Sequence, residues 1–144
     1  MKIKRSGSAA WQGGIKDGKG TISTGSGVLR DHPYGFNSRF EGGKGTNPEE
    51  LIGAAHAGCF SMALSKILGD AGHVAKKLAT TADVTLEQKD GGFTITAVKL
   101  TLDANIPGID ENTFQDLAAE AKANCPVSKV LNATITLDAT LSAT

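Results

Sequence analysis

The most apolar segment of the chain, residues 47–68, has the pattern of a buried helix. Asn47 is a good N-cap, Pro48 suits the first helical position, and Glu50 stands where a capping-box acid reaches back to the cap. From there to about residue 68 the positions are apolar or small on nearly every side. Because such a helix has no polar face, we expect it to be buried.

One small domain would struggle to cover this helix on every side. At about 1.5 Å per residue it extends roughly 30 Å, which is about the diameter of a small domain. Small residues would also let another backbone approach closely: Gly53, Ala54, Ala57 and Gly58. We therefore expect part of the cover to come from a second copy of the chain in a symmetric homodimer.

Glycine-rich turns divide the segment before this helix into short pieces. The dipeptide Asp17-Gly18 is a favourable hairpin turn. It predicts one strand near residues 2–13 and a second over residues 19–24.

The segment PYGFNSRFEG alternates between apolar and polar residues. Alternation of this kind predicts a strand with Phe36, Ser38 and Phe40 on one face. Arg39 would then lie on the opposite face and point away from the phenylalanines.

Beyond the long helix the apolar period changes to two. Val84 and Leu86 alternate with polar residues, KDGG provides a turn, and Phe93 and Ile95 begin the returning strand. The apolar phase of that strand then shifts, so we expect a bulge near Ala97.

Two further helices and a strand follow. Residues 106–124 predict a helix capped by Asp110, and CPVSKVL predicts a short helix with Pro126 at its first position. Residues 134–141 alternate as a strand does. Helices and strands segregated in this way predict an α+β fold, which we expect to form one domain over residues 1–144 with antiparallel sheets around the long helix.

The composition of the chain says little more about the fold, but it excludes some classes of binding partner. Lys plus Arg and Asp plus Glu both number 15, so the formal net charge is zero and nothing favours binding to nucleic acid. The basic first residues are not followed by the apolar run of a secretory signal, and we expect no segment long and apolar enough to span a membrane. We therefore expect a soluble, cytoplasmic protein whose two cysteines are reactive or simply buried.

The surroundings of the two cysteines differ. Cys125 stands immediately before Pro126, at the N-cap of the short helix, where the helix dipole favours a thiolate. Cys59 lies within the long helix, where burial would raise its pKa unless a cation were near. Arg39 is the candidate cation, and Glu49 could orient it. Each has a plain alternative without a catalytic role: Cys125 as a cap or buried filler, Cys59 as a packing residue, and Arg39 with Glu49 as a solvated ion pair.

Helix geometry limits how Glu49 and Cys59 could serve one site. They are ten residues apart, which is about 15 Å along one helix, so they cannot meet within one chain. Either Arg39 bridges the gap, or Glu49 comes from the partner subunit.

Other chemistry-bearing residues give weaker signals. His56, one helical turn before Cys59, could be a base, but we expect it to pack or to form a hydrogen bond. The histidines and cysteines lack metal-ligand spacing, and neither a phosphate loop nor a dinucleotide fingerprint is present in the sequence.

Two segments, NPEELIGAAHAGCFSMAL and CPVSKVLNA, resemble the two cysteine motifs of the osmotically inducible protein C and organic hydroperoxide resistance (OsmC/Ohr) family. GKGTISTGSGVL, PYGFNSRFEGGKG and PGID resemble the OsmC branch, so the similarity extends over nearly the whole chain. The resemblance implies an intertwined α+β homodimer that reduces organic hydroperoxides, with both sites at the subunit interface.

The resemblance also implies a role for each candidate residue. Cys59 would attack the peroxide and Cys125 would resolve the product as a Cys59–Cys125 disulfide. Arg39 matches the arginine that stabilises the thiolate, and Glu49 matches its salt-bridge partner.

The expected reaction follows from these roles. The Cys59 thiolate attacks the distal peroxide oxygen, an alcohol leaves, and the resulting sulfenic acid condenses with Cys125. An external dithiol must reopen the disulfide, for which the family's use of lipoyl-bearing proteins suggests a source, and no metal, haem or flavin is needed. Alkyl or fatty-acid hydroperoxides would be preferred if apolar residues line the entrance: Phe36, Phe40, Leu51, Ile52 and Met62.

Two rival functions stay open at this point. The leading function is an enzyme of oxidative and osmotic stress defence. Its first rival is a non-catalytic dimer that acts as a redox sensor or binds a hydrophobic ligand. The other is a structural disulfide protein, in which neither thiol would react rapidly with peroxide.

Overall fold

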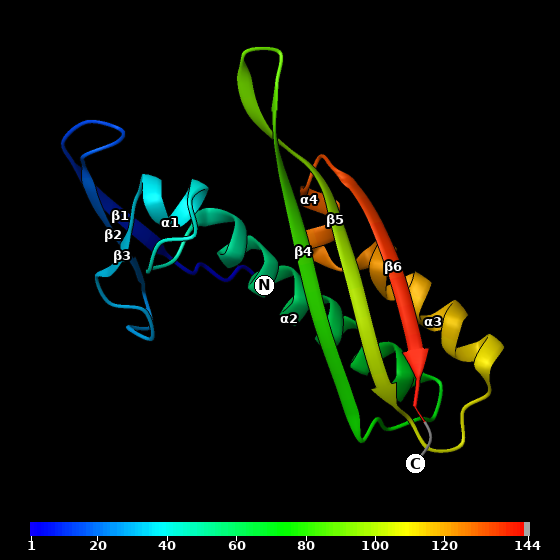
Figure 1. The fold of residues 1–144 in the computed structure, drawn as a ribbon. Helices are drawn as coiled ribbons and strands as arrows, with labels where there is room; N and C mark the ends of the chain where they lie inside the picture. Colours follow the sequence, from blue (N-terminus) through cyan, green and yellow to red (C-terminus); the bar gives the residue numbers. More distant parts are fainter. Residues whose placement is uncertain (143–144) are drawn as a thin grey trace. The chain divides into compact units, whose positions relative to one another are not determined.

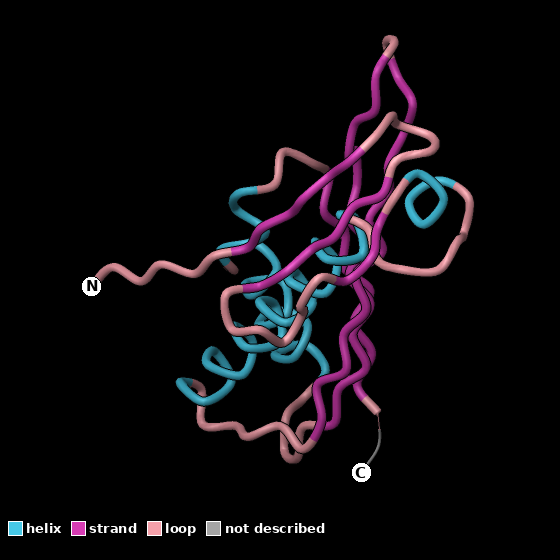
Figure 2. Tube along the Cα trace, turned by 90° about the vertical axis from the view of Figure 1, so that its left-hand side faces the viewer, coloured by secondary structure: helices cyan, strands magenta, loops and turns pink. Residues whose placement is uncertain are grey.

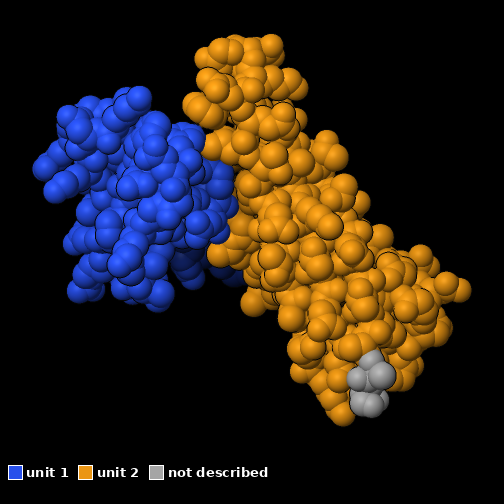
Figure 3. Space-filling view, viewed as in Figure 1, with its two compact units in different colours: residues 1–51 blue, residues 52–144 orange. Residues whose placement is uncertain are grey.

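The computed structural model describes residues 1–142 and divides the chain into two compact units, residues 1–51 and residues 52–144 (Figure 3). Each unit is described by itself. The elements within the described residues are β1 (Gly7–Gln12), β2 (Lys19–Thr24), β3 (His32–Tyr34), α1 (Phe36–Phe40), α2 (Pro48–Asp70), β4 (Lys77–Lys89), β5 (Gly92–Asn105), α3 (Glu111–Asn124), α4 (Pro126–Val130) and β6 (Thr134–Leu141) (Figure 1).

The first unit contains a small antiparallel sheet in the order β1-β2-β3. The predicted hairpin is confirmed, although β1 begins at Gly7 rather than near residue 2. The rings of Trp11 on β1 and Tyr34 on β3 pack 5.5 Å apart. This aromatic pair holds the outer strands together across the glycine of β2 that lies between them, Gly20.

The segment predicted as a strand from its alternation is instead the helix α1. Residues i and i+4 share a face in both kinds of element, so the spacing of Phe36 and Phe40 fits either one, and their rings pack 4.9 Å apart. Ser38 decides in favour of the helix: its hydroxyl accepts the Gly35 N–H at 3.0 Å and lies 2.8 Å from the Thr46 carbonyl. The guanidinium of Arg39 is therefore not turned away from the phenylalanines but lies 5.3 Å from the Phe40 ring centre.

The start of α2 is confirmed in detail. Asn47 Oδ1 accepts the Glu50 N–H at 2.8 Å, and the Asn47 side-chain amide donates to the Glu50 carboxylate at 2.7 Å. The acid thus returns to the side chain of the cap. The helix ends at Asp70.

Burial of α2 is confined to one face of the helix within this single chain. The buried positions are Gly53, His56, Phe60, Leu64 and Leu68. The opposite face is exposed and is composed largely of small residues and Met62, which is 77% exposed. One chain therefore covers only half of a helix whose sequence suits burial on nearly every side.

α2 also has the length and apolar composition of a membrane-spanning helix. The expectation that no segment would be long and apolar enough is therefore wrong for residues 48–70. The core helix of a soluble protein passes the same test, and the buried face of α2 contributes to the hydrophobic core of the second unit.

The second unit contains the sheet β4-β5-β6, with helices packed on one of its faces (Figures 1 and 2). β4 and β5 form a long antiparallel hairpin, and the predicted bulge is confirmed, since Thr85 pairs with Ala97 but Leu86 pairs with Ile95. The expectation of antiparallel sheets is confirmed for β1-β2-β3 and for β4-β5 but is wrong for β6, which pairs parallel to β5. The reason is the long connection through α3 and α4, which is the crossover that a parallel neighbour requires.

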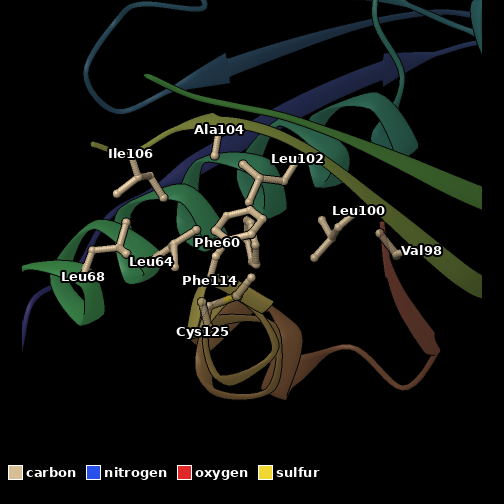
Figure 4. Close-up of a cluster of buried hydrophobic side chains, with 12 residues drawn as sticks. Phe60, Leu64, Leu68, Val98, Leu100, Leu102, Ala104, Ile106, Phe114 and Cys125 are labelled. Carbon is tan, nitrogen blue, oxygen red and sulfur yellow. The ribbon is translucent and has the colours of Figure 1, made fainter. Parts of the chain in front are cut away.

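The core of the second unit lies between this sheet and the helices. Phe60 from α2 and Phe114 from α3 meet beneath Leu100 and Leu102 of β5, and all four are buried (Figure 4). Cys125 lies at the edge of the same cluster and is 0% exposed. The core therefore holds the connection between α3 and α4 against the cysteine-bearing helix.

Candidate functional site

The backbone at Cys125 ends one helix and begins the next. Its N–H donates to the Ala121 carbonyl at 3.0 Å and closes α3, while its side chain caps α4. Sγ accepts the Ser128 N–H at 3.4 Å and lies 3.1 Å from the Ser128 hydroxyl. The predicted N-cap is confirmed, and Pro126 occupies the first helical position because its missing N–H is not needed there.

Cys59 faces this connection from α2. Its thiol is half-buried and lies close to the Cys125 thiol and to the Val127 N–H, both of which act on its pKa. Burial raises the pKa of Cys59 above its usual value, the Val127 N–H opposes that rise, and the neighbouring Cys125 thiol adds to it. Both cysteines are free, so the structure brings together two reduced sulfurs from residues far apart in the sequence.

A groove of about 530 Å³ leads to Cys59. Its lining is mostly apolar and consists of Cys59, Met62, Ala63, Lys66, Ile67, Glu120, Asn124 and Pro126. Cys125 does not line it. A small molecule in this groove would therefore meet the sulfur of Cys59 first. We call Cys59, Cys125 and this groove the thiol site.

Arg39 and Glu49 form a two-bonded ion pair in the first unit. Arg39 Nε donates to Glu49 Oε1 at 3.0 Å, and Nη2 donates to Oε2 at 2.8 Å. The Arg39 side chain is 34% exposed and that of Glu49 is 11% exposed, so the pair is partly protected from water. The hydrogen bond to Glu49 is the largest cause of the raised pKa of Arg39, which keeps the guanidinium charged.

An apolar cavity of about 290 Å³ adjoins this ion pair. It is lined by Trp11, Ile15, Tyr34, Gly35, Phe36, Arg39 and Phe40. A fixed cation thus lies at the edge of a pocket with aromatic walls. We call the ion pair and this cavity the arginine site.

The structure therefore brings together Cys59 and Cys125 within the second unit, and Arg39 and Glu49 within the first. The packing role expected for His56 is confirmed: the ring is 0% exposed, and Nε2 lies 2.7 Å from the Ser128 hydroxyl. Ser128 was not anticipated from the sequence. Its signal was its position, three residues after the cap Cys125, where a backbone N–H returns to the cap side chain.

Metal ligands do not gather at either site. Among residues 1–142, no group of three or more His, Cys, Asp and Glu side chains is arranged to hold a metal ion. Besides the two thiols, the polar groups of the thiol site are those of Lys66, Glu120 and Asn124 in the groove.

Comparison with known proteins agrees with the fold and with the family that the sequence resembles. The family model described as OsmC-like protein matches residues 41–140. Peroxiredoxin OsmC of Escherichia coli (strain K12) is 61% identical over 138 residues, which cover 96% of each chain. The organic hydroperoxide resistance protein OhrB of Bacillus subtilis (strain 168) is 36% identical over 118 residues, covering 76% of this chain and 79% of OhrB.

Solved structures show the same relationship. The crystal structure of OhrB from Bacillus subtilis superposes with a TM-score of 0.70 at 29% identity and covers 94% of this chain and 98% of its own. The organic hydroperoxide resistance protein from Elizabethkingia anophelis gives a TM-score of 0.74 at 28% identity and covers 99% and 100%. By sequence and by fold, this chain belongs to the OsmC/Ohr family of OsmC-like proteins.

Proposed function

We propose that this protein is a thiol-dependent peroxidase that reduces organic hydroperoxides to alcohols. The observation that carries the proposal is the thiol site itself: two free, neighbouring cysteines, one of them lining an apolar groove. The relatives named peroxiredoxin and organic hydroperoxide resistance protein support the same reaction.

The proposed reaction begins at Cys59. Its thiolate attacks the distal oxygen of the hydroperoxide, the O–O bond breaks, and the alkoxide takes a proton and leaves as an alcohol. Cys59 becomes a sulfenic acid. Cys125 then attacks the oxidised sulfur, the S–S bond forms, the S–O bond breaks, and the hydroxide leaves as water with the proton given up by Cys125.

Burial raises the pKa of Cys59 in spite of the Val127 N–H, so efficient attack requires a cation. We propose that Arg39 of the partner subunit supplies it in a homodimer. Glu49 and Cys59 belong to one continuous helix and lie about 15 Å apart along its axis. A guanidinium held by Glu49 would have to bridge that distance to reach the Cys59 of its own chain. The exposed face of α2, with its small residues, is the surface that a second copy would cover.

The arginine site also suggests the substrate class. Its aromatic walls favour an alkyl or fatty-acid chain over water, while the guanidinium can donate hydrogen bonds to the peroxide oxygens. Hydrogen peroxide has no apolar part to bury, so we propose that it is the poorer substrate.

The remaining parts of the proposal concern turnover and setting. An external dithiol, for which a lipoyl-bearing protein is the candidate, reopens the disulfide, and no metal or prosthetic group takes part. We further propose that the chain acts as a single functional domain in the cytoplasm, without membrane or nucleic-acid partners, in defence against oxidative and osmotic stress.

The decisive experiment follows peroxide loss by the reduced protein, comparing tert-butyl hydroperoxide with hydrogen peroxide, with and without dihydrolipoamide. We expect sustained turnover that needs the dithiol and favours the organic peroxide. Consumption of a single equivalent would instead support a redox sensor, and no consumption would favour ligand binding.

Two cysteine variants test the assigned roles. Cys59→Ser is expected to abolish peroxide consumption, because no sulfenic acid can form. Cys125→Ser is expected to consume one equivalent and then stall or over-oxidise. Equal loss of the first oxidation in both variants would contradict these roles.

A further inference from the structure

A buried histidine and a buried serine lie directly behind the resolving cysteine. His56 Nε2 is 2.7 Å from Ser128 Oγ, and Ser128 Oγ is 3.1 Å from Cys125 Sγ. His56 and Cys125 are 0% exposed and Ser128 is 8% exposed. The three side chains form a continuous hydrogen-bonded row that connects α2 to the sulfur, and nothing in the peroxidase cycle described above uses the first two.

The direction of this row follows from the histidine ring. Within residues 1–142, His56 Nδ1 is buried and has no hydrogen-bond partner. Burial lowers the pKa of His56, so the ring is neutral and carries one N–H near pH 7. Buried N–H groups without a partner are rarer than buried acceptors without one, which places the proton on Nε2, where Ser128 accepts it.

A serine hydroxyl has only one hydrogen to donate. Because its oxygen already accepts the His56 N–H, that hydrogen is directed to the other neighbour, Cys125 Sγ. The sulfur then faces two donors of one residue, the Ser128 O–H and the Ser128 N–H at 3.4 Å. Both donors favour negative charge on the sulfur.

We propose that His56 and Ser128 are positioning residues for Cys125 in the resolution and recycling steps. This inference rests on the proposed peroxidase function. In resolution, the two donors stabilise the Cys125 thiolate that attacks the Cys59 sulfenic acid, forming the S–S bond and releasing water. In recycling, they stabilise the same thiolate as the leaving group.

The leaving-group role also assigns the sulfur that the reductant attacks. Cys59 lines the open groove, whereas Cys125 is 0% exposed. A thiolate of the external dithiol therefore attacks Cys59, the S–S bond breaks, and Cys125 departs to its Ser128 donors. The second thiol of the reductant then displaces Cys59 as a thiolate and leaves as an oxidised, cyclic disulfide.

The test separates the two oxidation steps in a single turnover. Reduced protein is mixed with one equivalent of tert-butyl hydroperoxide and quenched at intervals, and mass spectrometry measures sulfenic acid and disulfide. The variants are Ser128→Ala, His56→Leu and His56→Gln, since a glutamine amide can place an N–H near the position of Nε2. Ser61→Ala is the matched control, because it removes a different hydroxyl, on α2, that lies 2.7 Å from the Thr80 hydroxyl.

Ser128→Ala and His56→Leu are expected to leave formation of the sulfenic acid unchanged and to slow disulfide formation about tenfold, the effect of losing one hydrogen bond to a charged sulfur. His56→Gln is expected to restore most of the rate, and Ser61→Ala to match the wild type. A wild-type rate of disulfide formation in His56→Leu would overturn the inference, as would a His56→Gln rate as slow as that of His56→Leu. Equal slowing of both steps would also overturn it, since that is the result of a purely structural role.

Over-oxidation provides a second readout. A sulfenic acid that waits longer for Cys125 meets more peroxide, so the concentration that inactivates half of the protein should fall by the same factor as the resolution rate. Unchanged sensitivity in Ser128→Ala would contradict the inference. If the wild type never oxidises at Cys59, the proposed function itself fails. The experiment distinguishes that result from a failure of the positioning role of His56 and Ser128 alone.

Discussion

The ion pair between Arg39 and Glu49 gives the sharpest test of the arginine site. Arg39→Lys keeps the positive charge, but its one nitrogen cannot take the places of both Nε and Nη2, which donate at 3.0 and 2.8 Å in a fixed plane. Glu49→Gln keeps the shape and removes the charge. Either change should therefore leave a cation near the site that is no longer held in one orientation.

The magnitude follows from the protection of the pair. A hydrogen bond to a charged group contributes about 1.5–3 kcal/mol, and the lower end applies here because Arg39 is 34% exposed. Each single variant should then lower kcat/KM about tenfold. Because both changes undo one interaction, the double variant should also lose about tenfold rather than about a hundredfold.

The assay is a double-mutant cycle on kcat/KM for tert-butyl hydroperoxide with dithiol in excess. Lys77→Met is the control, since it removes another ion pair, the 2.8 Å contact with Asp103, from the β4–β5 hairpin. It should leave kcat/KM unchanged. A double variant whose loss equals the product of the two single losses would refute the claim that Arg39 and Glu49 act as one unit.

Three further predictions concern pH, packing and assembly. Because burial holds the pKa of His56 below its usual 6.5, the unfolded chain binds a proton that the folded chain excludes, so the free energy of unfolding should fall as pH drops below about 6.5. Urea unfolding of His56→Gln should show less of this loss, and identical pH profiles would contradict the assignment. Gly53→Ala should destabilise the fold by about 1–3 kcal/mol, because the new Cβ would lie 2.9 Å from the Ala82 carbonyl oxygen. Gly69→Ala, whose Cβ would meet open space, should stabilise the fold by about 0.5–1 kcal/mol. Thermal unfolding measures both changes, and changes of the same sign would refute the close approach of α2 to β4. Met62→Lys should convert a dimer into a monomer of 14.8 kDa in sedimentation at micromolar concentration, because it places a charge on the face that a second copy would cover; a wild type that is already monomeric would remove the interface.

Local signals in the sequence predicted most elements correctly. The caps at Asn47, Asp110 and Cys125 are each side chains that bond to a backbone N–H three residues later, so a short motif contains the whole interaction. The bulge beside Ala97 was visible for a similar reason, because a change of apolar phase along one strand requires an extra residue.

The errors arose where a pattern has two physical readings or where the cause lies far away in the chain. Phe36 and Phe40 share a face in a helix and in a strand alike, and the hydrogen bonds of Ser38 favour the helix. The direction of β6 depends on the path of the chain through α3 and α4, which alternation within β6 does not encode.

The candidate residues follow the same division. The proximity of Arg39 to Glu49 and the caps could be proposed from residue type and spacing. The meeting of Cys59 with Cys125 was implied only by resemblance, because 65 residues separate the two in the sequence. Ser128 and the direction of its hydroxyl depend on a buried ring from another helix, which no local motif reports.

The parallel pairing of β6 with β5 has a consequence for how the protein acquires its chemistry. The β4–β5 hairpin closes from neighbouring residues, but β6 can pair only after the whole crossover containing Cys125 has been made and folded back, and such non-local pairing is slow. A growing or partly folded chain therefore carries Cys59 before it carries a neighbour for it. The two sulfurs become neighbours only after the crossover through α3 and α4 has folded back onto α2, so redox competence is acquired after the hairpin has formed.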